Sequence, residues 1–544
     1  MTGLGTSQRR GADDGDAPSA SRGQEAGVAA PERGFRLWPP QVTFDTGPLA
    51  ARARAVGASL TPAALWRNHR LFTIAACVSV IPRVIAALGF KPALLTQDSF
   101  SYMKEGVQFA VGQLRPAGYP LMLRALEPFH SLLLVTTLQH LMGIALGVII
   151  YAVLRRRGLP AWGATLAAVP TLFDSRQIWL ESSILPDTLF TFVLMIAVAI
   201  LVVWPRPAIW QAVIVGLLVS WASAIRGNGA PVFVVILAFL LVMRVGWKVF
   251  TACLAAFLVP LAAYGLIFFS EHGQLNITDS TGLFLWSRTM SFANCAVIKP
   301  PPSLVPLCPE NQPGHPAGPA PAWSVPALLG ERTPADYLWA PGAWYRVNAH
   351  PGVNARNNKL AMQFAERAIA AQPLAYLGTV GKEVLETFFT TDRSQDYLAM
   401  QFTVAPHVNP EVGYMRYWEH RYAHARSNTH VVQPWAYFMF LYQEPVWFPG
   451  WVFFLVMAGG LVLLIRRWRG PGRLAALAWG VAVVSLVLPI AAHELDYRYA
   501  ISAVPFACLA LGLTFARKPA SAASGASAAS GASDASAAEV VSAD

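Results

Sequence analysis

The stretch LFTIAACVSVIPRVIAALGFKPALLTQDSFSY, from Leu71 to Tyr102, decides the fold. Its first part, 71–90, is apolar and about as long as the roughly twenty residues that a helix needs to cross a bilayer. Asp98 follows shortly afterwards, where hydrocarbon gives way to water and a carboxylate can stay ionised without the full cost of burial. We therefore expect a membrane helix followed by a candidate catalytic base, Asp98. The alternative is that Asp98 only caps a short helix expected over Ser99–Gln113.

The composition of the 544 residues is that of a polytopic membrane protein. Hydrophobic residues make up 55% and charged residues 13%, whereas a soluble globular protein carries about 25% charged residues. The net charge of +11 does not indicate nucleic-acid binding, because the basic residues cluster next to apolar runs, as topology signals do. We therefore expect a lipid bilayer, and no nucleic acid, as a partner.

Apolar runs of suitable length recur along the chain, so we expect an all-α protein with about ten transmembrane helices. The runs cover approximately 71–90, 131–153, 160–178, 186–204, 208–225, 230–246, 248–269, 445–465, 474–492 and 499–516. Basic clusters such as Arg155–Arg157 belong in the cytoplasm by the positive-inside rule. Alternating spans satisfy these placements with both termini cytoplasmic, which predicts a multi-pass plasma membrane protein.

This topology divides the chain into five parts. Residues 1–65 and 519–544 are expected to be a disordered cytoplasmic leader and tail, because they offer few large apolar groups. Residues 66–269 form a transmembrane module with the first outer loop, and 445–518 form the C-terminal transmembrane helices. The segment 270–444 is too long for a loop without structure of its own, so we expect an extracytoplasmic α-rich domain.

Two cysteines of that outer segment, Cys295 and Cys308, are expected to form a disulfide, because a disulfide persists outside the cytoplasm. Two free thiols are the alternative.

Most ionisable residues that are not topology signals fall on the outer side. The acids are Asp98, Asp174, Glu181 and Asp187, and the cations are Arg226, Arg288, His493 and Arg498. The planar fork of arginine suits bidentate contact with phosphate oxygens. Two alternatives remain open: Asp187 can be an ordinary first-turn acid of the fourth span, and 493–499 can be an interfacial salt-bridge cluster.

Four motifs on this side carry a family resemblance: QDS at 97–99, RPAGYP at 115–120, LPDTLF at 185–190 and RYAI at 498–501. In this order they resemble the GT-C superfamily of polytopic membrane glycosyltransferases. The closest likeness is to the bacterial protein O-mannosyltransferase and aminoarabinose-transferase branch, in an actinobacterial-type form. The resemblance covers about 71–230 and 445–516.

The resemblance implies transfer of a hexose or pentose from a polyprenyl-phosphate sugar to an extracytoplasmic glycan, lipid or protein acceptor of the cell envelope. Asp98 is then the general base, and Asp187 matches the second catalytic acid. Arg226, Arg288, His493 and Arg498 are expected to bind the donor phosphate, and Asp174 and Glu181 form a second acidic cluster.

The chain departs from the family pattern at three of these positions. Gln97 stands where many relatives have a second acid, Arg115 where many have His, and Asp187 where many have Glu. A divalent cation is therefore left open as a cofactor, because such an ion needs several oxygen ligands. The alternative function is a transporter or flippase of a lipid-linked glycan, which would place essential charges deep within the spans.

Overall fold

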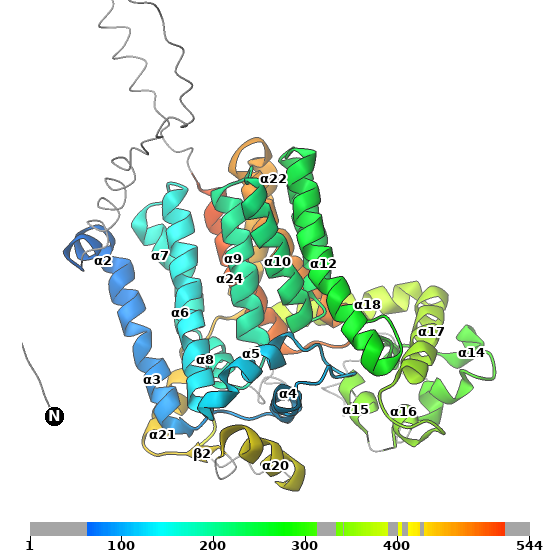
Figure 1. Cartoon of the computed structure of the whole chain (residues 1–544). Coiled ribbons are helices and arrows are strands. Elements are labelled where there is room, and N and C mark those ends of the chain that lie inside the picture. The colour runs from blue at the N-terminus through cyan, green and yellow to red at the C-terminus, as the bar shows by residue number, and fades with distance from the viewer. Residues whose placement is uncertain are drawn as a thin grey trace, which may run out of the picture. The chain divides into compact units, whose positions relative to one another are not determined.

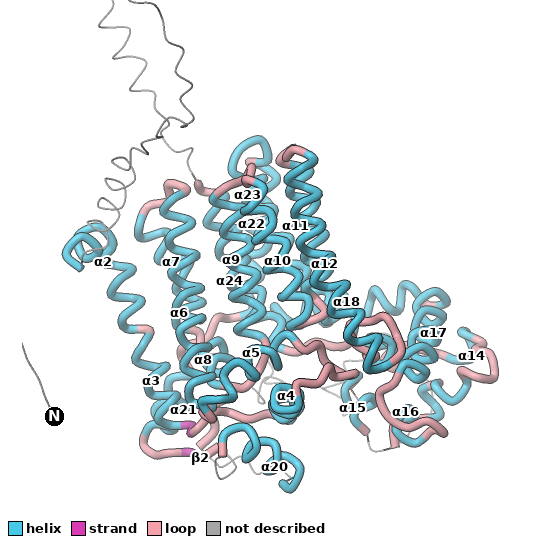
Figure 2. Tube along the Cα trace, viewed as in Figure 1, coloured by secondary structure: helices cyan, strands magenta, loops and turns pink. Residues whose placement is uncertain are grey.

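The computed structural model describes residues 62–312, 333–340, 342–389, 401–404, 412–424 and 429–516. This part of the chain is mostly helical, with one two-stranded sheet (Figures 1 and 2). The α-helical character of the predicted fold is therefore confirmed. Most of the expected leader and the whole expected tail lie outside the described residues.

Each of the ten predicted spans corresponds to an apolar helix or helix pair. They are α2 (Pro62–Val78) with α3 (Val80–Gly89), α6 (Leu132–Arg156), α7 (Ala161–Phe173), α9 (Asp187–Val203), α10 (Ile209–Ile225), α11 (Gly229–Val242), α12 (Trp247–His272), α22 (Gly450–Arg466), α23 (Arg473–Ala492) and α24 (Tyr497–Thr514). A π-helical turn, η4 (Trp468–Gly472), joins α22 to α23.

Within the described ranges, five helices are long and apolar enough to cross a membrane by themselves. They are His69–Gly89, Leu132–Arg156, Trp247–His272, Trp468–Ala492 and Tyr497–Thr514. The helices of the other five predicted spans are shorter. The shortest, α7, has 13 residues, and at about 1.5 Å per residue it reaches only about two thirds of the way across a hydrocarbon core. The membrane character of the chain follows from these helices, whereas the count of ten crossings stays a prediction.

The surface of these helices carries large apolar side chains, as a lipid-facing surface does. Ile81 on α3, Leu166 on α7, Val259 on α12 and Leu455 on α22 are all more than half exposed. Lipid tails are as apolar as these side chains, so helices that face lipid can carry them on the outside. The outward side chains therefore agree with the hydropathy of the sequence.

Short helices gather at one end of the bundle, opposite the α6–α7 and α11–α12 turns (Figure 1). They are α4 (Gln97–Gln108), α5 (Gly118–Leu126), η1 (Glu127–Phe129) and α8 (Ser175–Ser182). Just before α4, Leu94 forms a parallel bridge with Ser183, and its amide donates to the Ser182 carbonyl at 2.9 Å. Because Leu94 and Ser183 precede Asp98 and Asp187 by four residues each, this bridge brings the starts of α4 and α9 together.

The small helices after α12 surround a second apolar core. They are α13 (Thr281–Thr289), α14 (Cys295–Ile298), η2 (Val305–Leu307), η3 (Pro309–Asn311), α15 (Pro334–Trp339), α16 (Trp344–Val347) and α17 (Ala355–Ala371), followed by α18 (Pro373–Phe389). Trp286, Leu307, Tyr337 and Phe364 are buried in this core. The 281–371 region is therefore a small α-rich unit, packed beside α18 at one end of α12 (Figure 2).

The remainder of the expected 270–444 domain does not share this core. The elements α20 (Val412–Ala423), β2 (His430–Val431) and α21 (Trp435–Gln443) lie beside α3 and α4. Strand β2 pairs antiparallel with β1 (Phe90–Lys91), and Tyr422 and Met439 belong to the core of the large bundle. The segment expected as one domain is thus divided between two cores.

Candidate functional site

A cavity of about 520 Å³ is lined by residues from eight helices or their ends and from the loops between them. Asp98, Arg115, Arg226, His493 and Arg498 all face it, so the structure brings together five ionisable residues from four distant stretches of sequence. Phe284 of α13 and Trp339 of α15 add an apolar wall from the small unit. The volume is within the range of about 300–1,000 Å³ that is usual for small-molecule sites.

Asp98 is held between two arginines at the centre of this group. Its Oδ1 accepts a hydrogen bond from Arg115 Nη2 at 2.5 Å, and its Oδ2 accepts one from Arg498 Nη1 at 3.2 Å. Burial disfavours the ionised carboxylate, but the two arginines outweigh burial, so the pKa of Asp98 lies below its usual value. In this structure Asp98 is a charged counter-ion and a weak base.

The helix-capping alternative for Asp98 is wrong. Helix α4 begins at Gln97, and Thr96 is its N-cap residue. The backbone amide of Thr96 donates to Ser99 Oγ at 2.9 Å, and the two hydroxyl groups are 3.2 Å apart. Because Thr96 and Ser99 form the cap, the Asp98 carboxylate is available for the arginines.

Arg226 and Asp187 form a second ion pair behind the first. The Asp187 side chain is fully buried, and its Oδ1 accepts a hydrogen bond from Arg226 Nη1. Arg226 lines the cavity and stacks over the Tyr499 ring at 4.9 Å, whereas Asp187 is not among the lining residues. Asp187 therefore orients Arg226 from its position in the first turn of α9, which agrees with a positioning role better than with contact to substrate.

Two glycines allow close backbone packing next to Arg115 and Arg226. A Cβ atom at Gly118 would lie 2.4 Å from the Ala224 carbonyl carbon, and one at Gly229 would lie 2.4 Å from the Ser223 amide nitrogen. Only a residue without Cβ allows backbone segments to approach so closely. These glycines seat the start of α5 on the end of α10 and close the tight turn that carries Arg226.

The start of α24 supplies the third arginine. Asp496 is the N-cap residue, and its Oδ1 accepts from the Arg498 amide at 3.0 Å while its Oδ2 accepts from Arg498 Nε at 2.5 Å. His493 Nε2 lies 3.2 Å from Glu494 Oε1, and His493 Nδ1 lies 3.1 Å from Ser287 Oγ. The expected salt-bridge cluster at 493–499 is present, and it also lines the cavity.

The cavity is also surrounded by helix N-termini. Lining residues belong to the first turn or the N-cap of α4, α9, α11, α13 and α24: they are Asp98, Pro186, Asn228, Ser280, Thr281, Asp496 and Arg498. Each helix N-terminus carries a partial positive charge of about half an elementary charge. Together with three arginines, these ends favour negative groups in the cavity, and in this structure carboxylates occupy that role.

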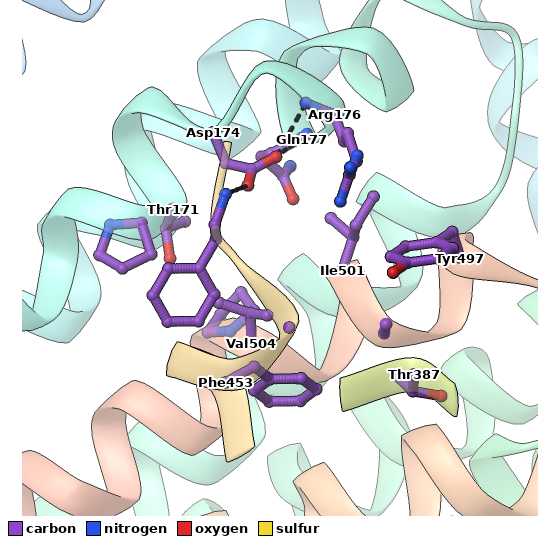
Figure 3. Close-up of a pocket in the computed structure, with 14 residues that line it drawn as sticks. Thr171, Asp174, Arg176, Gln177, Thr387, Phe453, Tyr497, Ile501 and Val504 are labelled. Atoms are coloured by element: carbon purple, nitrogen blue, oxygen red, sulfur yellow. Dashed lines mark hydrogen bonds between the residues drawn. The ribbon is translucent and has the colours of Figure 1, made fainter. Parts of the chain in front are cut away.

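The second acidic cluster lies elsewhere. Asp174 caps α8, because its Oδ1 accepts from the Arg176 and Gln177 amides and its Oδ2 from the Phe448 amide at 2.6 Å. Figure 3 shows Asp174 beside a separate cavity of about 30 Å³, which is large enough for a water molecule but too small for a sugar. Asp174 also lies at the edge of a larger, mostly apolar cavity of about 940 Å³. Asp174 is therefore a structural cap between α8 and the loop before α22.

Glu181 belongs to a fully buried ion-pair network. Its carboxylate accepts from Arg83 Nε and Nη2 at 2.8 and 2.9 Å, from Gln177 at 3.0 Å, and lies 3.0 Å from His140 Nδ1. Arg83 is the main charge within the predicted spans, and this bidentate pair satisfies it. The network joins α3, α6 and α8 and does not line the large cavity.

Arg288 is also placed away from the cavity. Its side chain is fully buried, and Nη1 donates to Glu383 Oε1 of α18 at 2.5 Å. Glu383 Oε2 in turn accepts from the Leu495 amide at 2.8 Å. Arg288 thus ties the small unit to the loop before α24, and the prediction that it contacts a donor phosphate does not agree with this placement.

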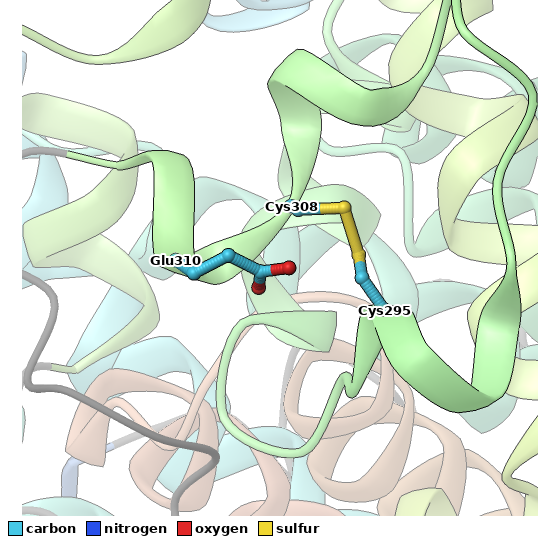
Figure 4. A group of neighbouring side chains, drawn as sticks. All are labelled: Cys295, Cys308 and Glu310. Carbon is cyan, nitrogen blue, oxygen red and sulfur yellow. A yellow bond between two sulfur atoms is a disulfide. The ribbon is translucent and has the colours of Figure 1, made fainter.

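Cys295 and Cys308 form a disulfide in the structure (Figure 4). Glu310 lies close to both sulfur atoms, and these three side chains form the one group of three metal-ligand types found among the described residues. Both sulfurs are consumed by the disulfide and cannot act as thiolate ligands. This group therefore does not supply a metal centre.

The sequence does not predict the role of three contributors to the site. Arg115 is identified only as a motif residue that departs from the family pattern, although it forms the shortest contact to Asp98. Phe284 and Trp339 gave no signal, because an aromatic residue in an outer segment is equally suited to a core. Comparison with protein-family models, curated proteins and solved structures found no match, so the geometry of the site carries the functional argument.

Proposed function

We propose that this chain is a membrane glycosyltransferase of the GT-C type, which transfers a sugar from a polyprenyl-phosphate donor to an acceptor outside the cytoplasm. The observation that carries the proposal is the convergence of Asp98 with Arg115, Arg226 and Arg498 in one cavity at the end of an apolar helix bundle. In this proposal the chain crosses the bilayer ten times, and the basic turns at the opposite end face the cytoplasm.

The proposed reaction is a direct displacement at the anomeric carbon. The acceptor oxygen bonds to this carbon while the bond from the carbon to the phosphate oxygen breaks, and its electron pair stays on the phosphate. Asp98 takes the proton of the acceptor hydroxyl. One negative charge therefore moves from the Asp98 carboxylate to the leaving polyprenyl phosphate. The arginines of the site can stabilise this charge on the phosphate.

The arrangement of charges supports phosphate as the group that is recognised. Arginine forks make bidentate contacts with phosphate oxygens, and helix N-termini bind phosphate through their free amides. Both features surround the same cavity. Stabilising charge that grows on a leaving group is commonly the largest contribution to catalysis of this kind, so the donor phosphate belongs beside Arg115 and Arg498.

The position of the site at a bundle end suits a lipid-linked donor. The prenyl chain can remain among the apolar helices while the sugar phosphate reaches the cavity from the bilayer surface. The aromatic wall of Phe284 and Trp339 offers apolar faces of the kind on which sugar rings pack. The small unit that carries both residues would then contribute to selection of the sugar or the acceptor.

The test is incubation of the purified protein in lipid nanodiscs with a panel of polyprenyl-phosphate sugars and acceptors, with donor consumption and covalent product both measured. Asp98→Asn is expected to lower transfer by about 10²–10⁴-fold, the usual contribution of a general base, while the protein still unfolds in one cooperative transition, at a somewhat lower temperature because Arg115 loses its carboxylate partner. Glu366→Gln, at an exposed acid of α17 that does not line the cavity, is the control.

Three outcomes would contradict the proposal. Consumption of nucleotide sugars in place of lipid-linked donors would overturn the donor class. Wild-type transfer rates for Asp98→Asn would show that Asp98 is not the general base. Movement of a lipid-linked glycan across the nanodisc or vesicle membrane without a covalent product would favour the transporter reading.

A further inference from the structure

The three arginines of the cavity differ in how firmly they are held. Arg226 pairs with the fully buried Asp187, which is not a cavity-lining residue. Arg498 pairs through Nε with Asp496 at 2.5 Å, and Asp496 is fixed as the N-cap of α24. Each of these two arginines therefore keeps a carboxylate partner when another anion enters the cavity.

Arg115 has no such second partner among the described residues. Its Nη2 bonds Asp98, its Nη1 donates to the Tyr102 hydroxyl at 3.2 Å, and its Nε is buried without a hydrogen-bond partner. A buried donor without a partner costs free energy. Arg115 therefore has both a reason to accept a new anion and a donor atom with which to hold it.

Asp98 is correspondingly occupied. Both of its carboxylate oxygens accept hydrogen bonds from arginine, Oδ1 from Arg115 and Oδ2 from Arg498. A carboxylate in this state holds its charge firmly and takes a proton poorly. The resting geometry thus prevents Asp98 from acting as a base until at least one arginine is drawn away.

Resting on the proposed function, we infer that Asp98 and the donor phosphate compete for Arg115, so that binding of the lipid phosphate releases Asp98 to act as the base. The phosphate takes over the Arg115 guanidinium, while Arg226 and Arg498 remain anchored by Asp187 and Asp496 and complete the anion site. The site therefore exchanges one ion pair for another and makes its base available only when a donor is present.

The exchange also prevents unproductive chemistry. In the absence of donor, Asp98 stays paired and does not take protons from water or from an acceptor. Departure of the polyprenyl phosphate then frees Arg115 to pair with Asp98 again. The protonated Asp98 loses its proton as Arg115 returns, because a nearby cation favours the ionised carboxylate.

This inference predicts an unusual result for binding. The test measures the affinity of detergent-purified protein for farnesyl phosphate by isothermal titration calorimetry, with uncharged farnesol as the control ligand. If Asp98 only bound the phosphate or stabilised the fold, its removal would weaken the affinity for farnesyl phosphate or leave it unchanged. If Asp98 competes with the phosphate for Arg115, its removal strengthens this affinity. We therefore expect Asp98→Asn to bind farnesyl phosphate roughly tenfold more tightly than wild type, equivalent to about 1.4 kcal/mol.

Two further variants separate the exchange from general electrostatics. Glu494→Gln removes one negative charge from the same cavity but not from Arg115, since Glu494 bonds the Ala335 amide at 2.9 Å and lies beside His493. It is expected to change affinity less than Asp98→Asn does. Arg115→Gln is expected to weaken binding of farnesyl phosphate. The double variant Asp98→Asn/Arg115→Gln is expected to lose most of the tenfold gain in affinity that Asp98→Asn shows alone.

An unchanged or weaker affinity of Asp98→Asn, or an equal gain from Glu494→Gln, would overturn the exchange. Asp98→Ser serves as a second uncharged variant if the Asn side chain disturbs folding, which a thermal unfolding curve detects. These affinities are measured without turnover. Failure of the wild type to transfer any sugar would therefore refute the proposed function. The affinities of wild type and variants for farnesyl phosphate would still decide whether Asp98 competes for Arg115.

Discussion

Glu105→Gln is expected to remove a pH dependence that this acid gives to the stability of the fold. Glu105 lies on α4, about two turns after Asp98, and is only 8% exposed. Its Oε2 has no hydrogen-bond partner, and its Oε1 would lie 2.1 Å from a Cβ atom at Gly112. Burial raises the pKa of Glu105 to about 8, although Arg115 and Lys104 oppose this shift.

The direction of this pH dependence follows from the number of protons that the folded and unfolded states bind. The folded chain keeps Glu105 protonated up to about pH 8, whereas the unfolded chain releases this proton near the ordinary value of 4.5. The folded state binds more protons between these values, so the free energy of unfolding falls as the pH rises through this window. At about 1.4 kcal/mol per pH unit, the difference of 3.5 between 8 and 4.5 gives an upper bound of about 5 kcal/mol.

The assay is thermal unfolding in detergent at a series of pH values. Gln resembles the neutral carboxyl group, so Glu105→Gln is expected to match wild type near about pH 5 and to melt several degrees higher near about pH 9. Glu127→Gln is the control, because Glu127 is part of an exposed pair with Arg124, and such pairs contribute about 0–1 kcal/mol. Parallel curves for Glu105→Gln and wild type across the whole range would refute the reasoning.

Three further substitutions test the elements that hold the site. Glu181→Gln leaves Arg83 buried without its counter-ion and is expected to cost about 3–5 kcal/mol, measured as a lower melting temperature. Gly118→Ala forces a Cβ against the Ala224 backbone, so we expect a loss of about 1–3 kcal/mol together with reduced sugar transfer. Gly459→Ala, on α22 with open space around it and away from the cavity, is expected to cause no loss. Cys308→Ser opens the bridge to Cys295, 13 residues away, and is expected to cost about 2–4 kcal/mol; a reductant should lower the melting temperature of wild type but not of this variant.

The helices could be predicted from the sequence because hydropathy is a local property. The expected runs 131–153 and 208–225 correspond closely to α6 and α10. The division of 270–444 between two cores could not be predicted in this way. It depends on the pairing of β2 with Phe90 and Lys91, which lie more than three hundred residues earlier in the chain.

The same distinction applies to the site. Asp98, Arg226, His493 and Arg498 could be placed on one side of the bilayer by topology, and the structure brings them to one cavity. Arg288 satisfied the same criterion, yet it pairs with Glu383 on α18. Topology assigns a side of the membrane to a residue, whereas the partner of an arginine depends on packing between helices, which no local pattern records.

The charges of the cavity are arranged for an anion that arrives and leaves. Five helices begin at its wall, and an acid stands in the first turn or at the N-cap of three of them, namely Asp98, Asp187 and Asp496. Acids at these positions stabilise the helix ends when no ligand is present. Asp187 and Asp496 are held in place by burial or by capping bonds, whereas Asp98 is held by side-chain bonds to two arginines alone. The acid that is easiest to displace is therefore the one that the proposed reaction requires as a base, and this difference in restraint connects the resting fold to the proposed chemistry.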